Sequence, residues 1–277
     1  MTEAVKLVTL VNIIFIILLL ASSSVAGYLG EVLYYFAFAA PIFIGFYASG
    51  TLKKKREEIK GVAEPEEKYT SFSGKKALDI LPLIVPTVTV VFCISYLTSL
   101  LLSLAGIQGA TVENQGIFKM LLIHALVPAF LEEALFRYIA MRILLPYSKR
   151  WCIIYSAICF SLIHCDFTKM PYAFVAGVVF MAVDIAFESV WPSVILHLCN
   201  NAASVLWIKY CASTTACVIF FSVLVLFSTV SVAFIIVKRR KYRDLLRGLF
   251  DRGEGFAVSY APALLIFISC CIAALSL

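Results

Sequence analysis

The sequence contains few charged residues. They make up 14% of its 277 residues, against roughly a quarter in ordinary soluble domains. Hydrophobic residues make up 62%, and the mean hydropathy is +0.97. This composition excludes a soluble globular protein, an intrinsically disordered chain and a small disulfide scaffold. A nucleic-acid-binding protein is excluded as well, because the net charge of +6 lies in short loops rather than on a folded basic face.

The sequence also lacks the short motifs of several catalytic and metal-binding classes. It has no His-Glu-x-x-His, no Gly-x-Gly-Asp and no Gly-x-Ser-Gly, so zincin, presenilin-like and rhomboid-like protease mechanisms are unsupported. Its nine cysteines have no metal-type Cys-x-x-Cys spacing, and we expect them to pack as small apolar side chains. No internal repeat is found, which argues against a carrier built from inverted repeats.

Apolar runs of about twenty residues recur along nearly the whole chain, and each can cross a hydrocarbon core about 30 Å thick. Backbone polar groups in lipid must be satisfied internally, so runs of this length predict helices. We therefore expect an all-α fold, a polytopic transmembrane helical bundle of eight or nine helices forming one integral membrane domain over residues 1–277. The first run also fits a secretory signal peptide cut after Ala26. The expected spans are 4–26, 31–50, 78–106, 117–146, 151–166, 171–188, 190–209, 211–237 and 257–277.

Lysine and arginine residues predict the orientation in the membrane. With a cytoplasmic N-terminus, almost all of them fall on the cytoplasmic side, and only Lys119, Lys169 and Lys209 lie on the other side. We expect a multi-pass protein of the plasma membrane with this orientation. The cytoplasmic group comprises Lys6, Lys53, Lys54, Lys55, Arg56, Lys60, Lys68, Lys75, Lys76, Arg142, Lys149, Arg150, Lys238, Arg239, Arg240, Lys241, Arg243, Arg247 and Arg252.

Most of the ionisable residues at membrane depth fall in three places. An ionisable side chain there costs on the order of 3 kcal/mol even on insertion scales, so each is a functional candidate. Glu132, Glu133 and Arg137 lie in the span 117–146, His164 lies at the end of 151–166, and His197 to Asn201 lie in 190–209. Elsewhere we expect simpler roles: a packed, hydrogen-bonded side chain for His124, and a solvated helix end for Asp184 and Glu188.

The spacing within each group indicates what its side chains can do. Glu133 and Arg137 are four residues apart, so they share a helix face and can form an ion pair. Glu132 points about 100° away, as a second carboxylate that can act as a base near neutrality. His197 and Asn201 are also four residues apart and can donate two hydrogen bonds to a developing oxyanion. Because His197 lies nearer the cytoplasmic end of its span, we expect a cavity that opens towards the cytoplasm.

These residues form three motifs on successive apolar segments: Glu132-Glu133-x-x-x-Arg137, Phe160-x-x-x-His164 and His197-x-x-x-Asn201. In this order they resemble the CAAX protease and bacteriocin-processing (CPBP) family of intramembrane proteases, which contains the type II CAAX prenyl endopeptidases. The resemblance covers about residues 117–205, between N-terminal helices with a basic loop (1–110) and C-terminal helices (211–277). One departure is Glu188-Ser189-Val190-Trp191, where the family often has Gly-Ser-aliphatic-Trp, and it leaves the geometry of this turn open.

The resemblance implies hydrolysis of a peptide bond inside the bilayer. Glu132 would activate water with the help of His164, and His197 and Asn201 would form the oxyanion hole. The ion pair of Glu133 and Arg137 would hold the helix face and tune Glu132. We favour this metal-free mechanism because asparagine is a good oxyanion donor, but two histidines and a glutamate also allow a zinc site.

The implied partners are the lipid bilayer and a peptide or protein substrate, which in the family is often a prenylated CAAX protein. A leader peptide or a bacteriocin fits as well, because nothing in the sequence encodes the cleavage site. Two further functions remain open. One is a catalytically idle member of the family that binds another membrane protein as an immunity factor or scaffold, and the other is a proton-coupled carrier.

Overall fold

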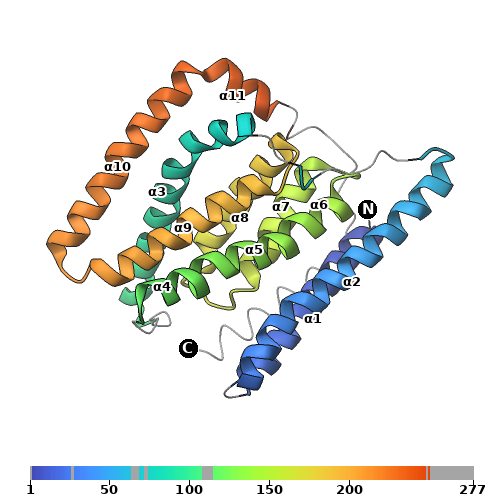
Figure 1. The fold of residues 1–277 in the computed structure, drawn as a ribbon, viewed down its shortest axis with the longest axis horizontal. Coiled ribbons are helices and arrows are strands. Elements are labelled where there is room, and N and C mark those ends of the chain that lie inside the picture. The colour runs from blue at the N-terminus through green and yellow to red at the C-terminus, as the bar shows by residue number, and fades with distance from the viewer. Residues whose placement is uncertain are drawn as a thin grey trace.

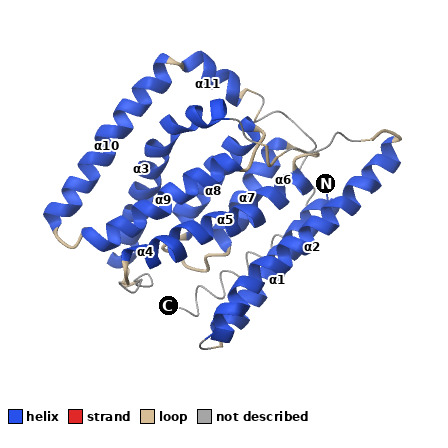
Figure 2. Ribbon diagram, in the orientation of Figure 1, coloured by secondary structure: helices blue, strands red, loops and turns tan. Residues whose placement is uncertain are grey.

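The computed structural model describes residues 2–25, 28–63, 69–71, 74–107, 115–247 and 249. These residues form helices joined by short connections and contain no strand, so the expected all-α helical bundle is confirmed (Figure 2). The expected span 257–277 lies outside the described residues. Each of the other expected spans corresponds to helical structure.

The N-terminal helices α1 (Thr2–Ser23) and α2 (Tyr28–Lys60) lie side by side along one flank of the bundle (Figure 1). On the other flank, α3 (Gly74–Leu104) packs against α10 (Thr214–Val237). The centre consists of α7 (Lys149–Leu162), α8 (Met170–Phe187) and α9 (Trp191–Tyr210), together with a long helix that begins at Ile117. A short helix α11 (Arg239–Leu246) follows α10.

The long central helix contains two π-helical turns. It consists of α4 (Ile117–Met120), a π turn over Leu121–Leu126, α5 (Val127–Glu133), a second π turn over Ala134–Ile139 and α6 (Ala140–Leu144). Wide turns of this kind are rare and occur frequently at functional sites. The second π turn begins directly after the two adjacent glutamates. The backbone geometry therefore changes next to the side chains that are most costly to place inside a membrane.

The helix ends follow local sequence signals. The side chain of Ser148 caps α7, and proline stands in the first turn of both α8 and α9, where its missing N–H costs nothing. Glu188 ends α8 with φ of 54°, a left-handed conformation that favours glycine. At the position where the resembling family often has glycine, this chain thus adopts a glycine-like backbone with a glutamate.

Among the described residues, five helices are long and apolar enough to cross a membrane: Thr2–Ser23, Val32–Lys60, Ala77–Leu104, Met170–Phe187 and Thr214–Val237. The protein is therefore an integral membrane protein. Its largest apolar core joins buried residues of α1, α6, α7 and α8, such as Phe15, Ile143, Ile153 and Met181. Helices α7 and α8 approach closely, because a Cβ added to Gly177 would lie 2.9 Å from the Cα atom of Ala157. This packing fixes the helices that carry the candidate site.

Candidate active site

Glu133 and Arg137 form the predicted ion pair. Both side chains are fully buried, and Glu133 Oε2 lies 3.0 Å from Arg137 Nε. The two atoms are close but are not aligned for a hydrogen bond. The guanidinium carbon of Arg137 also lies 4.1 Å from the centre of the Phe160 ring, in cation–π geometry. A buried charge without a partner is costly. Here Glu133 and Arg137 compensate each other's charge, and the Phe160 ring contacts the guanidinium group.

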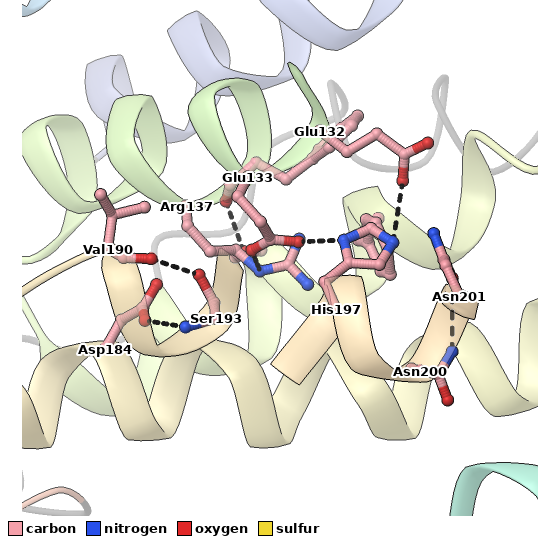
Figure 3. A network of polar contacts seen from close by, with 12 residues as sticks. Glu132, Glu133, Arg137, Asp184, Val190, Ser193, His197, Asn200 and Asn201 are labelled. Atoms are coloured by element: carbon pink, nitrogen blue, oxygen red, sulfur yellow. Dashed lines mark hydrogen bonds and ion pairs between the residues drawn. The ribbon is translucent and has the colours of Figure 1, made fainter. Parts of the chain in front are cut away.

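His197, on α9, connects this ion pair to the second glutamate. Its Nδ1 atom lies 2.7 Å from Glu133 Oε1, and its Nε2 atom lies 3.8 Å from Glu132 Oε2. A carboxylate can only accept a hydrogen bond, so Nδ1 of His197 donates to Glu133. Nε2 then points towards Glu132, and Figure 3 shows the imidazole ring between the two carboxylates.

His164 lies in the turn after α7 rather than inside a helix, because α7 ends at Leu162. Its Nδ1 atom is 2.8 Å from the carbonyl oxygen of Phe160, which only accepts, so Nδ1 donates and Nε2 is an acceptor. The Phe160 ring contacts both histidines, with ring centres 5.2 Å from His164 and 5.7 Å from His197. Phe160 therefore fixes the positions of Arg137 and of both imidazoles.

The two asparagines of α9 differ in orientation. Asn201 lies on the same side of the His197 ring as Glu132, whereas Asn200 points away from this side (Figure 3). Asn200 Nδ2 donates to Asn201 Oδ1 at 3.4 Å. This bond occupies the side-chain oxygen of Asn201. The Nδ2 group of Asn201 is therefore a donor that faces the same side as Glu132.

A cavity of about 490 Å³ brings the expected catalytic residues together. Glu132, His164, His197 and Asn201 all line it, although straight helices place them at depths that differ by roughly 10 Å. The turn after α7 and the connection to α8 remove this difference. Glu133 and Arg137 do not line the cavity and lie behind His197.

The cavity is also lined by residues outside the three motifs. His124 lines it, together with Tyr34, Lys169 and Tyr172. The expectation that His124 is simply a packed side chain is wrong, since it also lines an adjoining cavity of about 420 Å³ between α3, α9 and α10. Its position about two turns before Glu132 on the same helix was the available signal.

Asp184 is a second correction. The expected solvated helix end is wrong for Asp184, which is fully buried, and correct for Glu188, which is exposed. Asp184 Oδ1 accepts a hydrogen bond from the backbone N–H of Ser193 at 2.8 Å. Ser193 lies in the first turn of α9, whose N–H groups have no partner within the helix. Asp184 therefore fixes the start of α9 on α8, one turn before His197.

The connection between α7 and α8 carries a charged pair at the edge of the cavity. Lys169 Nζ lies 3.3 Å from Asp166 Oδ2, and Asp166 Oδ1 accepts hydrogen bonds from the backbone and the hydroxyl group of Thr168. Partial burial raises the pKa of Asp166, but these hydrogen bonds and Lys169 outweigh it, so its pKa lies below the usual value. Asp166 thus stays ionised and holds Lys169 beside the cavity.

Zinc binding finds little support in this arrangement. Within the described part of the chain, no three histidine, cysteine, aspartate or glutamate side chains are grouped so that they can hold a metal ion. Nδ1 of His197 and Nδ1 of His164 are also engaged in other contacts. The described residues therefore do not fit the zinc site that the sequence allowed.

Residues 114–203 match the family model described as type II CAAX prenyl endopeptidase Rce1-like. This segment is similar to that family. The match extends from the start of the long central helix to α9 and includes all three motifs, so the family resemblance is confirmed. No curated protein and no solved structure matches the chain. At the level of the Rce1-like family, the match supports a CAAX-protease-type hydrolase that acts on a peptide or protein in a membrane.

Proposed function

We propose that the protein is an intramembrane endopeptidase that hydrolyses a peptide bond of a membrane-associated or lipidated peptide or protein. One observation carries the proposal. Glu132, His164 and His197, from three separate parts of the chain, line one cavity inside an apolar bundle. Carboxylates and imidazoles at this depth are costly, and both are side chains that activate water by general-base catalysis.

Glu132 is the proposed general base. Its carboxylate takes a proton from water as the water oxygen attacks the peptide carbonyl carbon, and it then delivers this proton to the leaving amine. His164 Nε2 is an acceptor because Nδ1 donates to the carbonyl of Phe160. Water bound between Glu132 and His164 finds two acceptors, which would direct an oxygen lone pair at the substrate.

Asn201 and His197 are the proposed oxyanion hole. Asn201 can donate from its amide group in any protonation state. His197 already donates from Nδ1 to Glu133, so Nε2 becomes a donor only when the ring takes up a second proton. The buried carboxylate of Glu133 stabilises that imidazolium, which gives the Glu133–Arg137 pair a role behind the reacting atoms.

The test is cleavage of a pooled peptide library, including prenylated CAAX peptides, by purified protein in detergent. We expect the wild type to cleave and Glu132→Gln to lose at least about 100-fold in rate, because general-base catalysis contributes about this much or more. Glu188→Gln is the matched control, since Glu188 is exposed and does not line the cavity. Equal cleavage by the wild type and Glu132→Gln contradicts the assignment.

The same assay separates the alternatives. Cleavage that stops on addition of a chelator would restore the zinc mechanism. No cleavage by folded wild-type protein would favour the catalytically idle role, in which the same cavity binds a membrane partner without reaction.

A further inference from the structure

The two ends of the bundle differ in charge. One end, here called the basic end, comprises residues 53–60, 142–150 and 238–247, and its contacts join neighbouring elements. Lys241 pairs with Asp79 at the start of α3, and Arg142 donates to Ser49 of α2 at 3.0 Å. At the opposite end, Lys209 donates to the carbonyl oxygen of Gln115 at 3.1 Å.

Of the lysines and arginines that the structure describes, Lys119, Lys169 and Lys209 lie towards the opposite end. Figure 1 shows α6 and α11 at the basic end, and α4 and the turn between α9 and α10 at the other. Because lysine and arginine are enriched on the cytoplasmic side, this asymmetry predicts that the opposite end faces away from the cytoplasm.

The cavity extends to the opposite end. Its lining includes His164 and Lys169 of the connection between α7 and α8, and Tyr172 in the first turn of α8. Tyr34 near the start of α2 and Ile123 near the start of the long central helix lie at the same end. None of the lining residues belongs to the basic end as defined above.

This lining runs towards the end with few basic residues, whereas the cavity expected from the sequence opens towards the cytoplasm. That expectation rests on His197, which lies two turns from the basic end of α9. His197 instead forms part of the floor of the cavity, next to Phe180, with ring centres 5.5 Å apart. The walls run from this floor to the end that carries Lys169.

We propose that the cavity opens on the non-cytoplasmic side of the membrane and that its substrate is a peptide segment exposed on that side while attached to the membrane. The assignment of the substrate rests on the proposed function. Water for the reaction and the polypeptide would both reach Glu132 past Lys169. A segment confined to the cytoplasmic surface would meet the closed basic end of the bundle.

The orientation is tested with the full chain in intact cells and a membrane-impermeant maleimide. Lys169→Cys reports on the mouth of the cavity, and Lys54→Cys, exposed on α2, is the matched control at the basic end. The modified position is identified by mass spectrometry of the peptides, so the native cysteines can stay. We expect Lys169→Cys to react in intact cells and Lys54→Cys to react only after permeabilisation. The reverse pattern, or reaction of both in intact cells, overturns the proposal.

A second labelling position controls for a folding defect of Lys169→Cys. Lys119→Cys is exposed at the same end as Lys169 and outside the cavity, and it must react like Lys169→Cys. Reaction of Lys119→Cys only after permeabilisation overturns the orientation even if Lys169→Cys does not accumulate.

The substrate is tested with the peptide pool added outside sealed vesicles of either orientation. We expect cleavage by right-side-out vesicles and loss of cleavage by inverted ones. Cleavage by inverted vesicles alone overturns this inference but leaves the proposed function standing. No cleavage by either, or by detergent-solubilised protein, overturns the proposed function and the substrate assignment together, whereas the labelling result for the orientation stands.

Discussion

Helices α9 and α10 follow each other in the chain and have similar lengths, 20 and 24 residues, but they pack differently. α10 is among the five helices apolar enough to span a membrane, and none of its residues is buried. α9 is long enough but not apolar enough to be counted among them, and it buries Ser193, His197 and Asn200. The more polar of the two helices therefore lies in the interior.

This comparison shows how burial works in an apolar solvent. Lipid tails are as apolar as leucine, so no hydrophobic force drives α10 away from the membrane. The polar groups that α9 buries have partners inside the bundle, such as Glu133 and Asp184. Polar side chains therefore mark the interior of this bundle. Removing a polar partner in the interior should cost more free energy of unfolding than any change on α10.

The largest expected effect is that of Arg137→Leu. It leaves the carboxylate of Glu133 buried without a cation, and breaking a buried pair in this way costs about 3–5 kcal/mol of the free energy of unfolding. Thermal unfolding in detergent measures the loss. Arg240→Leu, on the exposed side of α11, is the control and should stay within about 0.5 kcal/mol of wild type. Similar shifts for both variants would contradict the contrast between interior and periphery.

A matched isoleucine pair compares the interior with α10 directly. Ile143 of α6 is fully buried, whereas Ile219 of α10 is 59% exposed. Ile143→Ala should cost about 2–5 kcal/mol because it leaves a cavity in the core. Ile219→Ala should change the free energy of unfolding by at most about 0.5 kcal/mol. If the two losses are equal in detergent, α10 has an apolar partner that the bundle itself does not provide.

A matched glycine pair should respond with opposite signs. A Cβ at Gly177 would lie 2.9 Å from the backbone of Ala157, so Gly177→Ala forces α7 and α8 apart, at a cost of about 1–3 kcal/mol. A Cβ at Gly50 of α2 would meet no atom within 4 Å. Gly50→Ala should therefore stabilise the helix by about 0.5–1 kcal/mol, because alanine loses less backbone entropy. Destabilisation by Gly50→Ala in the same unfolding assay would contradict this.

The sequence predicts what depends on local spacing. The apolar runs predict the helices, and the spacing of four residues between Glu133 and Arg137 predicts their ion pair, because neighbours on one helix face need no tertiary information. The meeting of Glu132, His164 and His197 in one cavity depends on where α7 ends and on how α8 turns back. Tertiary packing decides both, so the spacing along the sequence does not indicate the end at which the cavity opens.

Asp184 shows the same limit at a single residue, and it carries the smallest predicted effect. It lies four residues from the left-handed turn at Glu188, where solvation is the ordinary expectation, but the N–H of Ser193 needs an acceptor inside the bundle. Asp184→Ala should cost about 0.5–2 kcal/mol, as loss of a helix cap does.

Asp184→Asn separates the carboxyl group of Asp184 from its role as a hydrogen-bond acceptor. Only Oδ1 of Asp184 has a hydrogen-bond partner, so Asp184→Asn keeps the acceptor and should unfold closer to wild type than Asp184→Ala. Asp244→Ala, exposed on α11, is the control. Because the first turn of α9 positions His197, the alanine variant should also lower the cleavage rate more than the asparagine variant does. Equal losses for both variants would mean that the carboxyl group itself matters, rather than the hydrogen bond that fixes α9 on α8.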